Sequence, residues 1–192
     1  MEPIKSITTY KYDYMQAMTD SDFSDVEPVL FSYVEYDING HVLTSANYLN
    51  NNIIEQKSIC KYNEKGDLLE EILINQDGEI DEKKAYEYNS EGKISKEFLI
   101  YQDGSFDTTE YLYDSDGNLI EKKTQDPDGV LESSKKYIYK EKQLIQESSL
   151  DTEGNTLKEV QYAYNEKGNE VEISSYSAEE ERNIKIEMDY DE

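Results

Sequence analysis

The sequence predicts an all-β protein, an antiparallel meander of about seven tandem β-hairpin repeats that form a twisted or curled, elongated sheet. Three observations predict this fold. A tyrosine recurs every 24 to 26 residues, turn signals follow it at two fixed places in each period, and the segments between the turns alternate in polarity. Counting two strands for each copy gives a meander of roughly sixteen strands.

The recurring tyrosine, which we call the marker, sets the period. The intervals between successive markers are 24, 26, 26, 25, 26, 25 and 26 residues; the markers are Tyr12, Tyr36, Tyr62, Tyr88, Tyr113, Tyr139, Tyr164 and Tyr190. Two residues before each marker stands an apolar or aromatic residue, in the order Tyr10, Val34, Cys60, Tyr86, Tyr111, Tyr137, Tyr162 and Met188. Residues two apart share one face of a strand but lie on different sides of a helix. The pattern therefore favours strands with a tyrosine-rich face.

Two glycine turns punctuate each period. The first turn directly follows the marker, as in Asn63-Glu64-Lys65-Gly66, and the second comes about twelve residues later, as in Gln76-Asp77-Gly78. Glycine reaches positive φ without a steric penalty, which suits hairpin turns. The copy after Tyr139 has lost the glycine of its first turn. We expect the residue twelve positions after the marker, such as Ile74, to pair near the tyrosine columns.

Composition limits the classes of function. With 44 acidic and 19 basic residues the net charge is −25, which argues against binding to nucleic-acid phosphates or to an anionic membrane. The single cysteine, Cys60, rules out an internal disulfide framework and fits a reducing compartment. No signal sequence is visible at the start, so we expect a cytoplasmic protein, or a secreted or surface-attached one if the chain is a mature form.

One motif resembles a known repeat family. The segment Tyr111-Leu112-Tyr113-Asp114-Ser115-Asp116-Gly117-Asn118-Leu119 is similar to the YD repeat of bacterial RHS-type proteins, whose repeats build a large β-shell around a toxin domain. Seven copies are too few for such a shell, so the chain looks like a short form without a toxin domain. Short proteins with MORN-like repeats that act as antitoxins imply a binding or neutralising role. On this interpretation residues 1–30 form a degenerate first repeat with a non-repeat capping loop, and residues 31–192 form the YD-type hairpin array, in a single domain overall.

No residue type points to catalysis, so we expect a protein that is not an enzyme and has no cofactor. His41 is the only histidine and falls at an exposed turn position, which favours a turn residue without chemistry. Cys60 belongs to the column before the marker, which predicts a small buried residue with no nucleophilic role. The segment Asp114–Asn118 partly matches a calcium loop, but its glycine spacing is typical of a hairpin turn. Weak calcium binding at the turns remains an alternative.

The segment that interrupts the repeat is the candidate partner-binding site. From Tyr12 to Gln56 there is no lysine or arginine, and the non-repeat segment combines apolar and acidic side chains: Met15, Met18, Asp20, Asp22, Phe23, Asp25 and Glu27. A simple capping loop is the competing interpretation. We therefore expect an acidic interaction protein, such as an immunity protein or antitoxin that neutralises a basic toxin. The alternative is an extracytoplasmic or cell-surface repeat module that binds carbohydrate or protein.

Overall fold

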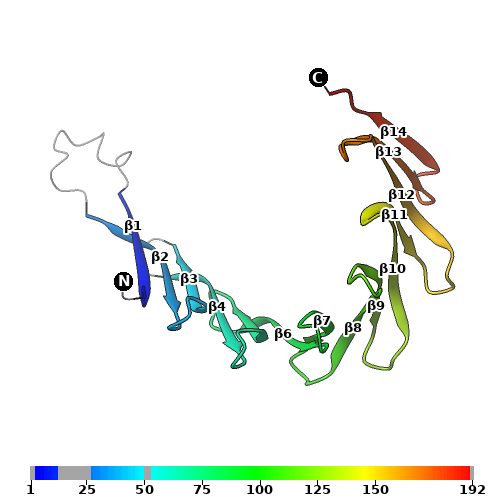
Figure 1. The fold of residues 1–192 in the computed structure, drawn as a ribbon. Coiled ribbons are helices and arrows are strands. Elements are labelled where there is room, and N and C mark those ends of the chain that lie inside the picture. Colours follow the sequence, from blue (N-terminus) through cyan, green and yellow to red (C-terminus); the bar gives the residue numbers. More distant parts are fainter. Residues whose placement is uncertain (1–2, 13–26, 50–52, 191–192) are drawn as a thin grey trace. The chain divides into compact units, whose positions relative to one another are not determined.

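The computed structural model describes residues 3–12, 27–49 and 53–190. These residues form a single open sheet in which the strands follow one another in chain order, with antiparallel hairpin pairing (Figure 1). The strands are β1 (Ser6–Lys11), β2 (Val29–Tyr36), β3 (Val42–Tyr48), β4 (Ile54–Tyr62), β5 (Leu68–Ile74), β6 (Ile80–Tyr88), β7 (Ile94–Ile100), β8 (Phe106–Tyr113), β9 (Leu119–Gln125), β10 (Leu131–Lys140), β11 (Gln143–Leu150), β12 (Thr156–Tyr164), β13 (Glu170–Ser177) and β14 (Arg182–Glu187). The predicted all-β meander of hairpins is confirmed, with fourteen strands in the described residues rather than sixteen.

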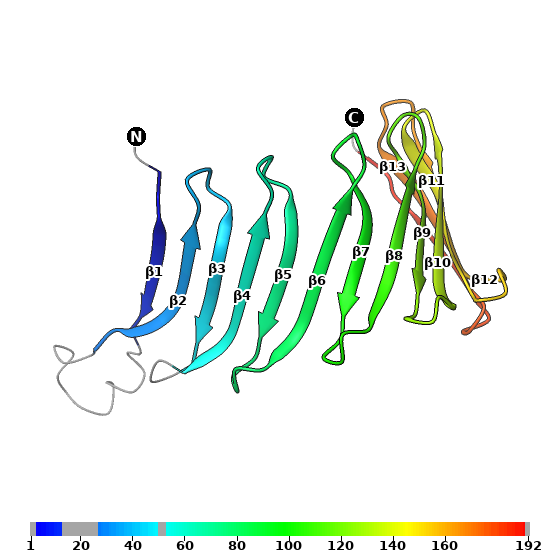
Figure 2. The ribbon, with the colours of Figure 1, turned by 90° about the horizontal axis from the view of Figure 1, so that it is seen from below.

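The chain divides into two compact units. One comprises residues 1–87 and 99–104, and the other residues 88–98 and 105–192. In the first unit the first turns lie along one edge of the strands and the second turns along the opposite edge (Figure 2). Each edge is therefore lined by one kind of turn.

The pairing register shifts at every marker for which the pairing is described. In β4 and β5, Lys61 pairs with Glu70 while Tyr62 pairs with Leu68, so Leu69 is an extra residue. Such a bulge increases the local twist of a strand pair. The same shift recurs before Tyr36, Tyr113, Tyr139 and Tyr164.

One prediction about pairing is wrong. Ile74, twelve residues after its marker, pairs with Lys57, which stands five residues before that marker, and not with the tyrosine columns. Hairpin partners are equally distant from their turn, so a residue near the far end of β5 must pair near the start of β4. The tyrosines are instead opposite the residues that directly follow the first turn.

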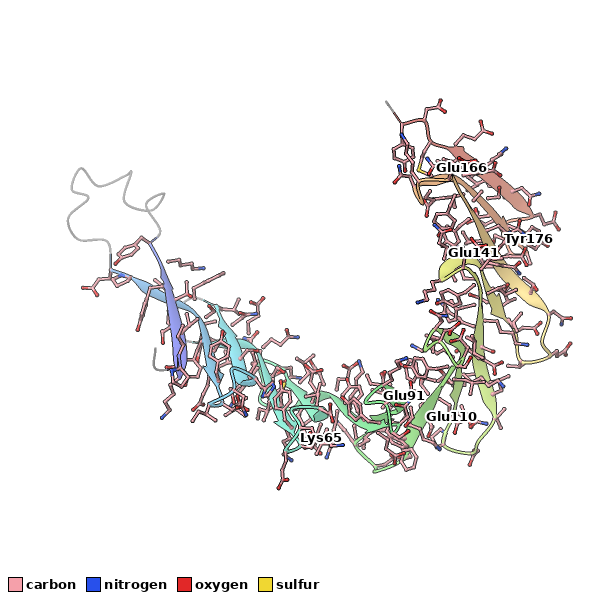
Figure 3. The ribbon with its side chains drawn as sticks, in the orientation of Figure 1. Lys65, Glu91, Glu110, Glu141, Glu166 and Tyr176 are labelled. Carbon is pink, nitrogen blue, oxygen red and sulfur yellow. The ribbon has the colours of Figure 1, made fainter. Side chains whose placement is uncertain are left out.

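The sheet is a single layer in both units. The buried apolar residues among those described are Ala46 and Val160, and most other strand residues are half-buried by their neighbours in the sheet. Side chains stand out on both sides of the strands, and within each unit no second layer of the described backbone covers them (Figure 3). Stability must therefore come from contacts between side chains on adjacent strands rather than from a core between two layers.

Four of the marker tyrosines form a hydrogen bond that ties their hairpin to the one before it. The hydroxyl of Tyr62 donates to the carbonyl oxygen of Val42 at 3.0 Å, and that of Tyr113 donates to Ile94 at 2.9 Å. The same contact joins Tyr164 to Leu144 at 2.8 Å and Tyr190 to Glu170 at 2.7 Å. In each case the acceptor lies 19 or 20 residues earlier, at the start of the strand after the preceding first turn.

The substitution Tyr113→Phe tests this tie, because it removes only the hydroxyl. We expect it to lower the free energy of unfolding by about 1 kcal/mol, the usual net contribution of one hydrogen bond. Tyr190→Phe should cost less, because Tyr190 belongs to the last copy and is 52% exposed. Urea unfolding of both variants measures the difference, and equal losses would contradict a tie that depends on position in the array.

Candidate functional site

The structure tests little of the predicted partner-binding segment. Met15, Met18, Asp20, Asp22, Phe23 and Asp25 lie outside the described residues, and Glu27 is exposed just before β2. The predicted site therefore stays a prediction. The candidate surface that the structure does describe is the acidic sheet with its two edges.

A second stretch without basic residues lies in the described part of the chain. Between Lys96 and Lys122 there is no lysine or arginine, whereas this interval holds seven acidic residues: Glu97, Asp103, Asp107, Glu110, Asp114, Asp116 and Glu121. The interval was not among the predicted partner sites, because it lies inside the regular repeat and does not interrupt the pattern. The spacing of the lysines was the signal that could have found it.

The turns are preorganised by their first side chain. Asp114 Oδ1 accepts hydrogen bonds from the backbone nitrogens of Asp116 at 3.0 Å and Asn118 at 2.8 Å, and Asp114 Oδ2 accepts one from Asn118 Nδ2 at 2.9 Å. Gly117 takes a φ of 82°, which a residue with a side chain rarely adopts. Asp151 and Asn155 repeat the arrangement in a second turn, so both edges use the same local chemistry.

The first and fifth residues of these turns are complementary. In the turn after Tyr62 the order is reversed: Asn63 Nδ2 donates to Asp67 Oδ2 at 2.8 Å. A carboxylate therefore faces an amide in both versions of the turn. The copy that lost its glycine turns differently, because Glu141 and Lys142 themselves take positive φ values of 53° and 69°.

These carboxylates have lowered pKa values. The Asn118 side chain is the main cause for Asp114, and the Asn155 side chain is the main cause for Asp151; backbone nitrogens of the same turns add to the effect. Hydrogen bonds to a carboxylate favour its charged form. Asp114 and Asp151 therefore stay ionised at acidic pH values at which an unperturbed aspartate is already protonated.

Along the first-turn edge, the residue after three of the turns contacts the next copy; these residues are His41, Lys93 and Gln143. His41 stacks on the ring of Tyr62, with ring centroids 4.9 Å apart, and its Nδ1 lies 2.8 Å from Asp37 Oδ2. A Cβ placed on Gly66 would lie 2.7 Å from His41 Nε2. The predicted turn position of His41 is confirmed, and the side chain also contributes to contact between repeats.

Other copies fill the same place with different side chains. Lys93 Nζ donates to the carbonyl oxygen of Gly117 at 2.8 Å and lies 5.2 Å from the centre of the Tyr113 ring. Gln143 Nε2 donates to Gly168 at 3.5 Å. Gly66 and Gly117 therefore serve two purposes. They adopt a positive φ, and their lack of a side chain leaves space for the side chain of the preceding copy.

Ion pairs run across the strands. Glu70 accepts from Lys61 on β4 and from Lys83 on β6, and these two contacts are the main reason that its pKa is lowered. In the other unit Lys185 lies 3.1 Å from Glu172 and 2.7 Å from Glu187. Most described ion pairs therefore join neighbours within the sheet, and the excess of carboxylates is left at the surface.

The tyrosine face offers no activated nucleophile among the described residues. Burial is the main cause that raises the pKa of Tyr62 to about 12, and the neighbouring Cys60, Glu71 and Asp37 contribute further. Tyr111 donates its hydroxyl to Glu97 Oε2 at 2.7 Å. Cys60 is half-buried rather than fully buried, with its sulfur 3.8 Å from Ser58 Oγ. Tyr62 and Tyr113, whose pKa values are raised by burial, therefore act as neutral hydrogen-bond donors at physiological pH.

Metal ligands and membrane spans were also examined. Within residues 3–12, 27–49 and 53–190, no group of three or more histidine, cysteine, aspartate or glutamate side chains is arranged to hold a metal ion. The same residues contain no helix with the length and apolar character needed to span a bilayer.

Comparison with known proteins supports the fold. No family model and no curated protein sequence matches the chain. In fold the chain is similar to the Tc holotoxin pore of Photorhabdus luminescens, with a TM-score of 0.51 and 14% identity. It is also similar to TcdB2-TccC3 without its hypervariable C-terminal region, with a TM-score of 0.52 and 14% identity. Each likeness covers 96% of this chain but 11% of the other chain.

These two similarities show a related β-sheet fold and nothing about activity, because the sequence identities are low. A porin-like protein from Bacteroides uniformis also aligns, over 96% of this chain and 94% of its own, with 10% identity and a TM-score of 0.37. That score is too low to support a relationship. This chain spans about a ninth of the length of the toxin chains it resembles.

The contact between His41 and Gly66 can be tested with a matched pair of glycines. Gly66 and Gly78 have φ values of 89° and 81°, but among the described atoms a Cβ at Gly78 would meet nothing within 4 Å. We expect both Gly→Ala changes to cost about 1–2 kcal/mol for the left-handed backbone. Gly66→Ala should cost about 0.5–1.5 kcal/mol more, because it displaces the stacked ring.

The control is Gly66→Ala in a His41→Ala background, measured by urea unfolding. In that background the extra cost should disappear. An extra cost that persists without His41 would contradict the contact between copies.

The lowered pKa of Asp114 gives a pH test. A carboxylate whose folded pKa is depressed stabilises the protein above its ordinary pKa near 3.9, and that stability is lost as pH falls through the lower folded value. Asp114→Asn places an amide against the Asn118 amide and should therefore be destabilising at pH 7. The difference from the parent should shrink as pH falls below about 4.

Urea unfolding between pH 7 and pH 2.5 measures this difference. The matched control is the double change Asp114→Asn and Asn118→Asp, which reproduces the Asn63–Asp67 arrangement and should keep the stability of the parent at pH 7. A difference between parent and Asp114→Asn that is constant with pH would contradict the assignment.

Proposed function

We propose that this chain is a non-enzymatic, acidic protein-interaction repeat protein that binds a basic protein partner. The observation that carries the proposal is the net charge of −25 of a chain whose described residues form a sheet that is one layer thick in each unit. Such a charge speeds encounter with a basic protein and repels nucleic acid. An open sheet also gives a partner a wide contact area with exposed apolar side chains between the charges.

We further propose that the repeat is a short form of the YD repeat and that the protein acts as an immunity protein or antitoxin. The spacing of the markers and the segment Tyr111–Leu119 support the first part. The fold similarity to two toxin structures is consistent with a shared repeat architecture, and the activity of those toxins is not transferred to this chain. The cytoplasm is the compartment that the single cysteine favours.

The experiment is capture of a cationic partner in the native host, followed by kinetics with the purified pair. The association rate should fall steeply between 50 and 500 mM salt while the dissociation rate changes little. If the partner is a toxin, its expression in a test bacterium should stop growth, and co-expression of this chain should restore it.

Charge reversal tests the predicted segment. Changing Asp20, Asp22, Asp25 and Glu27 to lysine should slow association without a change in the circular dichroism of the sheet. Association independent of salt, or a partner without a basic surface, would contradict the proposal. Association that the reversal leaves unchanged would show that the binding face lies elsewhere on the chain.

A further inference from the structure

A groove lies between two adjacent second turns of the first unit. It has a volume of about 430 Å³ and is lined by Ile80, Asp81, Glu82, Lys83 at the start of β6 and by Leu99, Ile100, Tyr101, Gln102 at the end of β7 and beyond. All of these residues belong to the same compact unit. Ile80 and Tyr101 are 44% and 43% exposed, so a large part of the groove wall is apolar surface open to solvent.

The groove walls are rigid turns. Asn75 Oδ1 accepts from the backbone nitrogens of Asp77 and Glu79, both at 3.0 Å, and Asn75 Nδ2 donates to Asp81 Oδ1 at 2.9 Å. On the other wall the backbone nitrogen of Gly104 donates to the carbonyl oxygen of Tyr101 at 3.0 Å. A ligand would therefore meet a preformed surface, which lowers the entropic cost of binding.

The rim is acidic. Residues 75–83 contain Asp77, Glu79, Asp81 and Glu82 but one lysine, and Asp103 stands on the opposite turn. The lysines beside the groove already form ion pairs: Lys83 lies 3.1 Å from Glu70, and Lys84 lies 2.9 Å from Glu82. Asp77, Glu79 and Asp81 are exposed; Asp81 lines the groove, and Asp77 and Glu79 lie just before it in the chain, in the turn that leads into β6.

We infer that this groove is a docking site for a basic segment of a protein partner, in which an apolar side chain is flanked by lysine or arginine. The apolar side chain enters between Ile80 and Tyr101, and the cationic groups lie over Asp77, Glu79 and Asp81. Apolar anchors supply most of the affinity of such contacts, while rim charges steer the approach and select against acidic partners. The inference rests on the proposed function, because it locates the footprint of the proposed basic partner.

A synthetic peptide with phenylalanine between two pairs of lysines is the probe, and its binding is measured by fluorescence anisotropy at 50 and 300 mM salt. We expect Asp77→Asn, Glu79→Gln and Asp81→Asn together to weaken binding about tenfold at low salt and to flatten the salt dependence. Tyr101→Ser should weaken binding while leaving the salt dependence as in the parent. A peptide with serine in place of phenylalanine should lose the effect of Tyr101→Ser.

The matched control neutralises three exposed acids of the other unit: Asp128→Asn, Glu132→Gln and Glu153→Gln. It makes the same change in net charge and should alter binding less than twofold. Hydrogen exchange with bound peptide should show added protection in residues 75–83 and 99–103. Circular dichroism checks that each variant keeps the sheet.

Two results would overturn the inference, and they are distinguishable. Equal weakening by both triple variants would mean that the peptide responds to overall charge and that the groove is not a site, while the proposed function stands. No salt-dependent binding of the peptide to any form would remove the groove as a basic docking site. The proposed function fails separately if the partner from the native host is not basic.

Discussion

The hydrogen bond from a marker tyrosine to the carbonyl of the preceding hairpin is the contact on which the array depends. A single-layer sheet has no second layer to fix the position of one hairpin against the next. The Tyr62 hydroxyl supplies part of that fixation by bonding Val42 from 20 residues away, and the ring gives His41 a surface to stack on. Four marker tyrosines reach such a carbonyl 19 or 20 residues earlier in the chain.

The turns complete the coupling between copies. At Gly66, Gly117 and Gly168 the missing side chain leaves room for the residue that follows the previous first turn, which is His41, Lys93 or Gln143 respectively. The carboxylates of Asp114 and Asp151 accept hydrogen bonds from backbone nitrogens of their own turns, so the turn edges are both rigid and charged. Hydrogen-bonded acidic turns therefore lie beside half-buried faces of the sheet.

Much of the fold could be predicted from the sequence, and much less of the site. The Tyr-x-Tyr spacing fixes strands by its period of two, and turn signals every twelve or thirteen residues fix their lengths. The groove beside Ile80 and Tyr101 could not be predicted in this way, because it depends on how two successive second turns stand next to each other. Ile74 does not pair near the tyrosine columns, because hairpin partners are equally distant from their turn and Ile74 lies at the far end of β5.

The sequence by itself determined the all-β class, the repeat length, the position of the turns and the strong negative charge. These properties are local or additive, since strand alternation, glycine backbone preference and charge do not depend on distant residues. Tertiary structure decided that His41 stacks on Tyr62, that Lys93 covers Gly117, and that Cys60 stays half-buried. Those outcomes depend on contacts between copies and on the absence of a second layer over the described strands, which no single period of the sequence encodes.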